Sequence, residues 1–195
     1  IAEAEAVLAA DGRYFVSGGA VVRIIERDGL GIGTERVNEQ TLRTVLSARI
    51  YWQRQGKDSI WSPCDPPPGV VQALLHGQDR DHLRSLSGLA RQPFYTPSGR
   101  LVAEPGYDRE TGIFAVFDAS EYQLGEPSRE LAEASLAYLD QHLDEFEFES
   151  EADRSAALCA MLTAAHRPSL PVAPAFNITA TSSGSGKSYL ADVII

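Results

Sequence analysis

The residues with the clearest chemical meaning lie near the end of the sequence, between Thr181 and Ser188, where it reads Thr-Ser-Ser-Gly-Ser-Gly-Lys-Ser. The closing triplet Gly186-Lys187-Ser188 matches the end of the phosphate-binding pattern Gly-x-x-x-x-Gly-Lys-Ser/Thr. Thr181 stands where that pattern has its first glycine. The segment therefore predicts a loop that binds nucleotide phosphates, with one departure that bears on the shape of the loop.

The chemistry of such a loop depends on donors that are already in place when a triphosphate arrives. Small residues at Ser183, Gly184, Ser185 and Gly186 allow successive backbone N–H groups to turn toward one anion. A helix that follows the loop directs its positive end to the same point. We therefore expect these four residues to bind the phosphates of ATP.

Two side chains of the loop have more specific predicted roles. We expect Lys187 to reach the terminal phosphates and to act as the catalytic residue, and the hydroxyl of Ser188 to bind Mg²⁺. ATP and Mg²⁺ are thus the predicted cofactors. The alternative is a flexible linker, rich in glycine and serine, that happens to contain a lysine.

A loop of this kind lies between a strand and a helix. Residues 175–180 form a short run of apolar and β-branched residues that predicts a buried strand, and residues 189–195 predict the start of a helix. The sequence stops seven residues after Ser188, before any acidic metal ligand or water-positioning residue that such an ATPase needs. It also starts with Ile1 and not with Met. We therefore expect the chain to be the N-terminal part of a larger ATPase, cut inside its nucleotide-binding domain.

The formal net charge of −10 is unevenly distributed along the 195 residues. Residues 121–153 hold eleven Asp or Glu residues and a single basic residue, Arg129. Lys57 and Lys187 are the two lysines of the sequence. Proteins bind nucleic acids by neutralising phosphates with a basic surface. We therefore expect nucleic acid to be a partner of the full-length protein that binds only weakly to this acidic chain.

The sequence contains no apolar run that approaches the length of a membrane span, and its acidic, alanine-rich start does not resemble a signal peptide. Cys64 and Cys159 are far apart and have no further ligand at metal-binding spacing. We expect no membrane partner, no zinc site and a cytoplasmic location, where thiols stay reduced.

Apolar periodicity and turn residues predict the elements that precede the loop. Helices are expected at residues 3–10, 38–49, 68–76, 128–143 and 150–165. Short strands are expected at residues 14–16, 20–25, 101–102 and 113–117. Together they predict a compact α+β domain of short strands, hairpins and helices over residues 1–170. Residues 171–195 are then the truncated strand–loop–helix start of an α/β ATPase core.

The inward faces of these elements predict a core that includes Leu42, Leu46, Val71, Leu74, Phe114, Val116, Leu139, Leu158 and Leu162. Asp108 and Thr111 carry groups that catalytic sites use. They stand in a glycine-rich turn, however, where Asp and Thr more often make local hydrogen bonds. We therefore expect them to shape the turn.

Several short motifs, taken in their order along the chain, resemble the helicase-like ATPases that are encoded beside or fused to primases in bacteriophages, prophages and integrative elements. The motifs are Gly12-Arg13-Tyr14, Asp65-Pro66-Pro67, Leu86-Ser87-Gly88, Gly106-Tyr107-Asp108 with Thr111-Gly112, Asp153-Arg154-Ser155-Ala156-Ala157-Leu158, and Ala173-Pro174. The resemblance covers most of the chain. It implies a role in the replication of a mobile element, ahead of a ring-forming or helicase-type ATPase core. As functional sites it transfers only Gly184, Gly186, Lys187 and Ser188.

Three classes of function stay open on the sequence. The first is the front part of an ATP-driven helicase or translocase, in which residues 1–170 position the core, form a homo-oligomer or bind partners. The second is another phosphate-loop phosphotransferase, and the third is a non-catalytic adaptor with a vestigial or linker-like loop. In the first class the full-length protein is an ATPase, and this chain alone is inactive.

Overall fold

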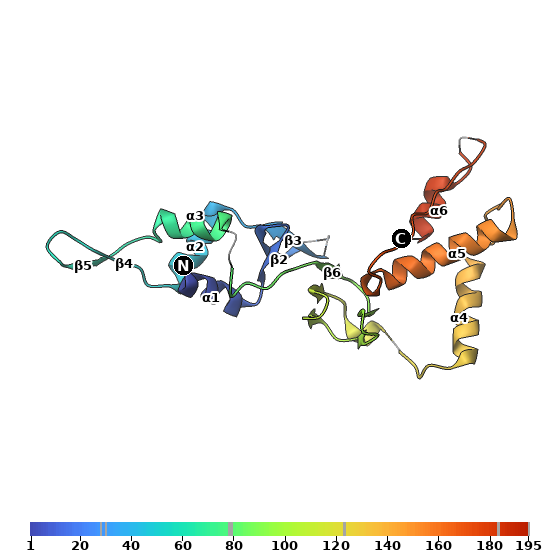
Figure 1. The fold of residues 1–195 in the computed structure, drawn as a ribbon, viewed down its shortest axis with the longest axis horizontal. Helices are drawn as coiled ribbons and strands as arrows, with labels where there is room; N and C mark the ends of the chain where they lie inside the picture. Colours follow the sequence, from blue (N-terminus) through green and yellow to red (C-terminus); the bar gives the residue numbers. More distant parts are fainter. Residues whose placement is uncertain (28, 30, 78–79, 123, 183, 195) are drawn as a thin grey trace. The chain divides into compact units, whose positions relative to one another are not determined.

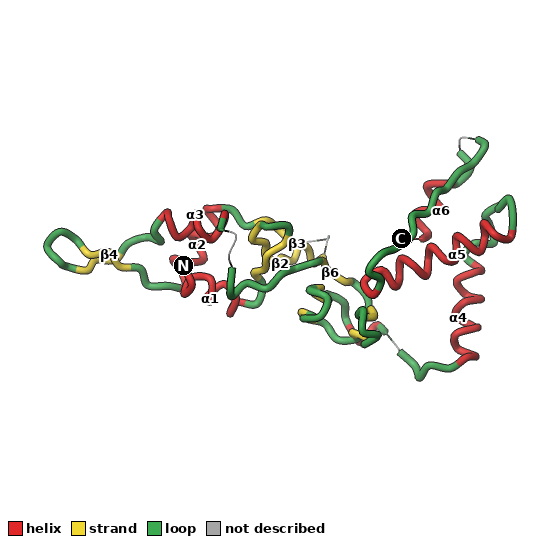
Figure 2. Tube along the Cα trace, in the orientation of Figure 1, coloured by secondary structure: helices red, strands yellow, loops and turns green. Residues whose placement is uncertain are grey.

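The computed structural model describes residues 1–27, 29, 31–77, 80–122, 124–182 and 184–194. Within these residues the chain is a mixture of helices and small sheets, which confirms the predicted α+β class (Figure 1, Figure 2). The chain divides into two units: Ile1–Leu89 with Tyr107–Val116, and Ala90–Gly106 with Phe117–Ile195. The predicted division at residues 170 and 171 concerns the start of an ATPase core and stays a prediction.

The first unit alternates helices and short antiparallel strands. Its elements are α1 (Ala2–Asp11), β1 (Tyr14–Ser17), β2 (Ala20–Arg27), β3 (Gly31–Arg36), α2 (Glu39–Arg49), β4 (Gln53–Gln55), β5 (Trp61–Pro63), α3 (Pro68–His76), β6 (Gly88–Ala90), β9 (Gly106–Tyr107) and β10 (Ile113–Ala115). One sheet has the order β1-β2-β3, a second has the order β6-β10-β9, and β4 pairs with β5. The predicted hairpin of β1 and β2 is confirmed, with Phe15 opposite Val22.

Local signals set the ends of the helices in this unit. The side chain of Asn38 accepts a hydrogen bond from the backbone N–H of Thr41 at 2.8 Å, as an N-cap does. α1 ends at Gly12, whose φ of 77° is a left-handed conformation that glycine adopts without a steric penalty. Pro68 occupies the first turn of α3, where its missing N–H has no partner to lose.

The core of the first unit lies where α1, α2 and α3 pack together. Its fully buried members include Leu8, Leu42, Leu46, Val71 and Leu74. The last four were predicted core residues, and their burial is confirmed. A second cluster centres on Phe15, with Leu86 buried and Phe114 half-buried beside it.

The pairing of β3 with β2 and the pairing of β4 with β5 were not predicted. β3 contains two glycines and polar residues, and the β4–β5 hairpin is exposed along its whole length. The hairpin carries exposed aromatic and aliphatic side chains near its ends, among them Tyr51, Ile60 and Trp61. Neither segment has the apolar alternation that predicts a half-buried strand.

The second unit is mainly helical. Its elements are β7 (Phe94–Tyr95), β8 (Leu101–Val102), the 3₁₀ helix η1 (Ala119–Glu121), α4 (Arg129–Gln141), α5 (Glu151–His166), the 3₁₀ helix η2 (Arg167–Ser169) and α6 (Lys187–Ile194). Ser128 and Ser150 cap α4 and α5 through hydrogen bonds from the backbone N–H groups of Leu131 and Asp153. Both caps lie at the predicted starts of these helices.

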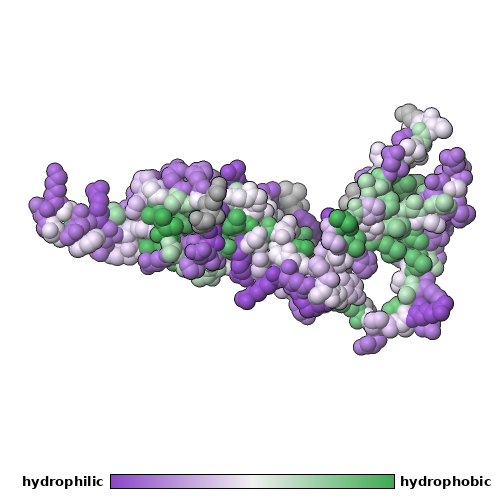
Figure 3. Space-filling view, viewed as in Figure 1, coloured by the Kyte–Doolittle hydropathy of each residue, from purple (hydrophilic) through white to green (hydrophobic). Residues whose placement is uncertain are grey.

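The core of the second unit is small. Leu143, Ala157 and Leu190 are buried, with Phe146, Leu158 and Met161 half-buried around them. No residue of α4 is buried. Leu162, a predicted core residue, is 38% exposed. The prediction for Leu162 is wrong because α5 is apolar on most of its circumference, so periodicity alone does not select its inward face. Figure 3 shows apolar side chains gathered over the surface of this helical region.

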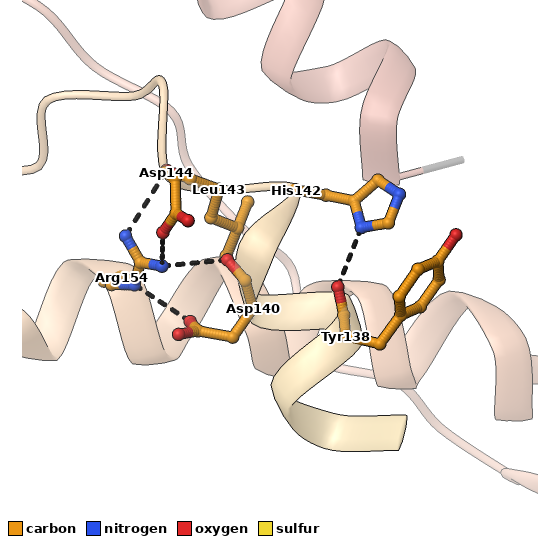
Figure 4. Close-up of polar contacts among 6 residues, drawn as sticks. All are labelled: Tyr138, Asp140, His142, Leu143, Asp144 and Arg154. Atoms are coloured by element: carbon orange, nitrogen blue, oxygen red, sulfur yellow. Dashed lines mark hydrogen bonds and ion pairs between the residues drawn. The ribbon is translucent and has the colours of Figure 1, made fainter. Parts of the chain in front are cut away.

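A single arginine joins the end of α4 to α5. The guanidinium of Arg154 donates to carboxylate oxygens of Asp140 at 2.9 Å and of Asp144 at 2.6 Å, and to the backbone oxygen of Asp140 at 2.8 Å (Figure 4). These contacts occupy both the charge and the donors of Arg154.

None of the helices in the described residues is both long and apolar enough to cross a lipid bilayer.

Candidate phosphate-binding site

The helix predicted after the loop is present, and it begins at Lys187. Its first turn closes with a hydrogen bond from the backbone N–H of Leu190 to the oxygen of Gly186, at 2.8 Å. Leu190 is buried against Leu143 and Ala157. The loop is therefore attached to a helix that is itself anchored in the small core of the second unit.

Two glycines give the loop its path. Gly184 and Gly186 have φ values of 79° and 84°. At Gly184 no atom lies within 4 Å of the position that a Cβ would take, so the backbone angle and not lack of space favours glycine there. Left-handed residues alternating with others along a short segment are typical of anion-binding backbone concavities. Ser185 stands between the two glycines and is exposed.

Lys187 folds back over this loop. Its Nζ donates to the backbone oxygen of Ser182 and to Oγ of Ser185, both at 3.2 Å. The side chain is half-buried, and its charge lies beside the loop backbone at the positive end of α6. Phosphate oxygens that enter the loop would replace these two neutral acceptors. A charged acceptor forms a stronger hydrogen bond with an ammonium group than a neutral one does.

The structure gives less detail for two other residues with predicted roles, Ser188 and Ser183. Ser188 is exposed in the first turn of α6, and Ser183 lies outside the described residues. Among the residues that the structure describes, no three His, Cys, Asp or Glu side chains form a group that could hold a metal ion. Ser188 is the residue that the motif assigns to Mg²⁺ here. One protein oxygen fits a magnesium ion that is held mainly by nucleotide phosphates and water.

The predicted strand before the loop is not formed. Residues 173–180 are described and carry neither helix nor strand, and Phe176 is 40% exposed. A strand exists only with a partner that takes up its backbone hydrogen bonds. In the second unit, the described residues form one pair of short strands, β7 and β8, and these pair with each other. Thus the apolar run at 175–180 has the composition of a strand but no partner.

Aromatic side chains beside the loop are the neighbours that sequence reasoning missed. The ring of Phe146 stacks on that of Tyr189, with centroids 5.6 Å apart and planes 27° from parallel. The ring centroid of Phe148 lies 6.3 Å from that of Phe146. A Cβ placed on Gly186 would lie 3.8 Å from Cε1 of Phe146. The two phenylalanines stand among acidic residues in the sequence, and only the fold brings them to the loop.

The segment that carries Phe146 is acidic. Asp144, Glu145 and Glu147 flank Phe146 in the sequence, and Arg154 is already bound to the carboxylates of Asp140 and Asp144. Hydrogen bonding from Arg154 holds the pKa of Asp140 below its usual value, so that carboxylate stays ionised.

Asp108 and Thr111 hydrogen-bond to each other within their turn. Oδ2 of Asp108 accepts hydrogen bonds from the backbone N–H of Thr111 at 3.0 Å and from its Oγ1 at 2.7 Å. The expected turn-forming role of both residues is confirmed.

Comparison with known proteins gives no further guide to the site, since no family model, curated protein or solved structure matches this chain.

Proposed function

We propose that residues 181–188 bind the phosphates of ATP together with Mg²⁺. The observation that carries the proposal is the position of Lys187. Its ammonium group lies over a loop with two left-handed glycines, at the first residue of a helix. A cation, the backbone of a short glycine-rich loop and a positive helix end then lie together, as the binding of a polyphosphate requires.

The roles of the individual residues follow from this arrangement. Gly184, Ser185 and Gly186 offer backbone N–H groups to the phosphates, as does Ser183 by its place in the pattern. Lys187 offsets charge on the terminal phosphates and is the proposed catalytic residue, because charge stabilisation and positioning are most of phosphoryl-transfer catalysis. Ser188 supplies a hydroxyl for Mg²⁺. ATP is the source of the phosphoryl group when it is bound.

The wider role of the chain rests on the resemblance of its ordered motifs to helicase-like ATPases. We infer that it is the N-terminal part of an ATP-dependent helicase or translocase that acts in the replication of a mobile element in the cytoplasm. Residues 1–170 then position the core, form an oligomer or bind partners. The unformed strand at residues 175–180 favours the second candidate, an adaptor whose loop does not bind nucleotide.

A titration of the chain with Mg-ATP, followed by calorimetry or by NMR, separates the two candidates. We expect weak but saturable binding that Lys187→Ala reduces by at least about tenfold. Lys57→Ala is a matched control, because Lys57 is the other lysine of the chain and lies in the exposed turn between β4 and β5. Equal binding by wild type and Lys187→Ala would contradict the phosphate-loop proposal and favour the adaptor.

A further inference from the structure

Tyr189 occupies a position that the phosphate-binding role does not explain. It stands in the first turn of α6, two residues after Lys187, and is 60% exposed. Side chains of a helix lean toward its N-terminus, which here is the loop. The ring of Tyr189 is thus an exposed aromatic surface beside the proposed phosphate site.

Tyr189 packs on one aromatic neighbour. Phe146 covers one ring face, with a centroid distance of 5.6 Å. Phe146 is in turn half-buried and packs with Phe148 and the core around Leu143. With one face covered, the exposed area of Tyr189 belongs to the opposite face and to the ring edge. An aromatic ring that already packs on a neighbour loses less conformational entropy than a free ring when a flat ligand stacks on it.

We propose that the free face of Tyr189, supported by Phe146, stacks on the base of the nucleotide whose phosphates enter the loop. This inference rests on the proposed function and names the part of the ligand that lies outside the loop. A planar ring, a cation and backbone donors adjoin one another within residues 184–189, and a nucleotide joins a planar base to an anionic tail in the same way. An apolar protein surface would match the ring but not the cation next to it.

The stacking surface also sets the expected base preference. Stacking depends on the area of the base and on its polarisability, and it tolerates different base edges. Purine nucleotides therefore bind more tightly than pyrimidine nucleotides, and ATP and GTP bind with similar affinity.

The test compares Mg-ATP with magnesium tripolyphosphate, which carries the same kind of anionic chain without a base. Wild type is expected to bind ATP more tightly than tripolyphosphate. Tyr189→Ala weakens ATP binding by between roughly fivefold and a hundredfold and leaves tripolyphosphate binding unchanged. Tyr189→Phe retains ATP binding, since the ring is kept. Tyr138→Ala, which removes an exposed tyrosine from α4 of the same unit, serves as the control and changes neither.

Two results would overturn the inference while the phosphate loop stands. One is equal affinity of wild type for ATP and tripolyphosphate. The other is an equal loss of both ligands in Tyr189→Ala, which would show that the ring only supports the loop. If wild type binds neither compound, the phosphate-loop proposal is itself overturned and the base site falls with it. The unchanged tripolyphosphate binding of Tyr189→Ala guards against a folding defect as the cause of its loss of ATP binding.

Discussion

Nε of Arg154 donates to Oδ1 of Asp140 at 2.9 Å and so ties the last turn of α4 to α5 (Figure 4). α4 has no buried residue, so this contact and the burial of Leu143 are what hold its C-terminal end in place. The same turn leads to Phe146 and from there to the loop. The position of the aromatic pair beside the loop therefore depends on Arg154.

Arg154→Ala is expected to lower the denaturant midpoint of the second unit and to weaken Mg-ATP binding. It removes two ion pairs and one donor to the backbone oxygen of Asp140, which also accepts from the backbone N–H of Leu143 at 3.0 Å. Arg129→Ala is the matched control, because Arg129 forms an ion pair with Glu133 on the exposed side of α4. Exposed pairs of that kind contribute little to stability. Equal midpoints of the two variants would show that the Arg154 contacts do not hold α4.

Three leucines test the burial pattern. Leu46 is fully buried, Leu158 is half-buried and Leu162 is 38% exposed. Leu46→Ala is expected to destabilise by about 2–5 kcal/mol, because it leaves a cavity among α1, α2 and α3. Leu158→Ala should cost less and Leu162→Ala about 0.5 kcal/mol or less. Chemical denaturation gives the order, and a large effect of Leu162→Ala would mean that its exposed face is covered in solution.

Asp11 gives the first unit a defined response to acid. Its side chain is 4% exposed and accepts from Arg13 and Arg49, both at 2.6 Å. The hydrogen bond from Arg13 is the largest cause of its lowered pKa. Asp11 ends α1, where the helix dipole disfavours a negative charge, so the two arginines offset an otherwise unfavourable position.

The sign of the pH effect follows from the lowered pKa. Ionised Asp11 stabilises the fold above its unfolded pKa of about 3.9, and this contribution is lost as the pH falls through the lower folded pKa. Asp11→Asn should therefore be less stable than wild type by about 1–3 kcal/mol at pH 7. The two proteins should converge as the pH falls through the lowered folded pKa of Asp11. Denaturation curves measured across this range would contradict the prediction if the difference persisted in acid.

The parts of the fold that were predictable depend on residues close together in the sequence. Asn38, Ser128 and Ser150 cap helices through N–H groups three residues away, so each helix start could be inferred from the local pattern. The same holds for Gly12 at the end of α1.

The parts that were missed depend on partners distant in the sequence. β4 is Gln-Arg-Gln, and only its pairing with β5 makes it a strand. Residues 175–180 show the reverse case, because their composition favours a strand that finds no partner. At the site, the motif located Lys187 and Ser188. The contact between Phe146 and Tyr189 joins segments far apart in the chain, which no local pattern contains.

Charge predicts weak binding of nucleic acid by this chain. Its net charge is −10, and several of its arginines are already paired with carboxylates, including Arg23, Arg49 and Arg154. We expect little binding of a labelled single-stranded oligonucleotide in a fluorescence anisotropy titration at low salt. Sub-micromolar affinity would contradict this prediction and would require a basic surface on the first unit. Its salt dependence would then give the number of phosphates contacted.

The last prediction concerns hydrolysis in a longer protein that contains this chain. Lys187→Ala is expected to abolish ATP hydrolysis and to leave the folded structure intact, since Lys187 makes its hydrogen bonds within the loop and not with the core. In the proposed function its charge lies beside the terminal phosphates, where charge stabilisation matters most. Ser188→Ala should also lose activity, and excess Mg²⁺ should rescue it poorly because the missing group is a ligand of the metal. A phosphate-release assay measures both variants, with Lys57→Ala as the control and circular dichroism as the check on folding. Turnover at the wild-type rate in Lys187→Ala would contradict the ATPase role of this loop and would favour the adaptor function.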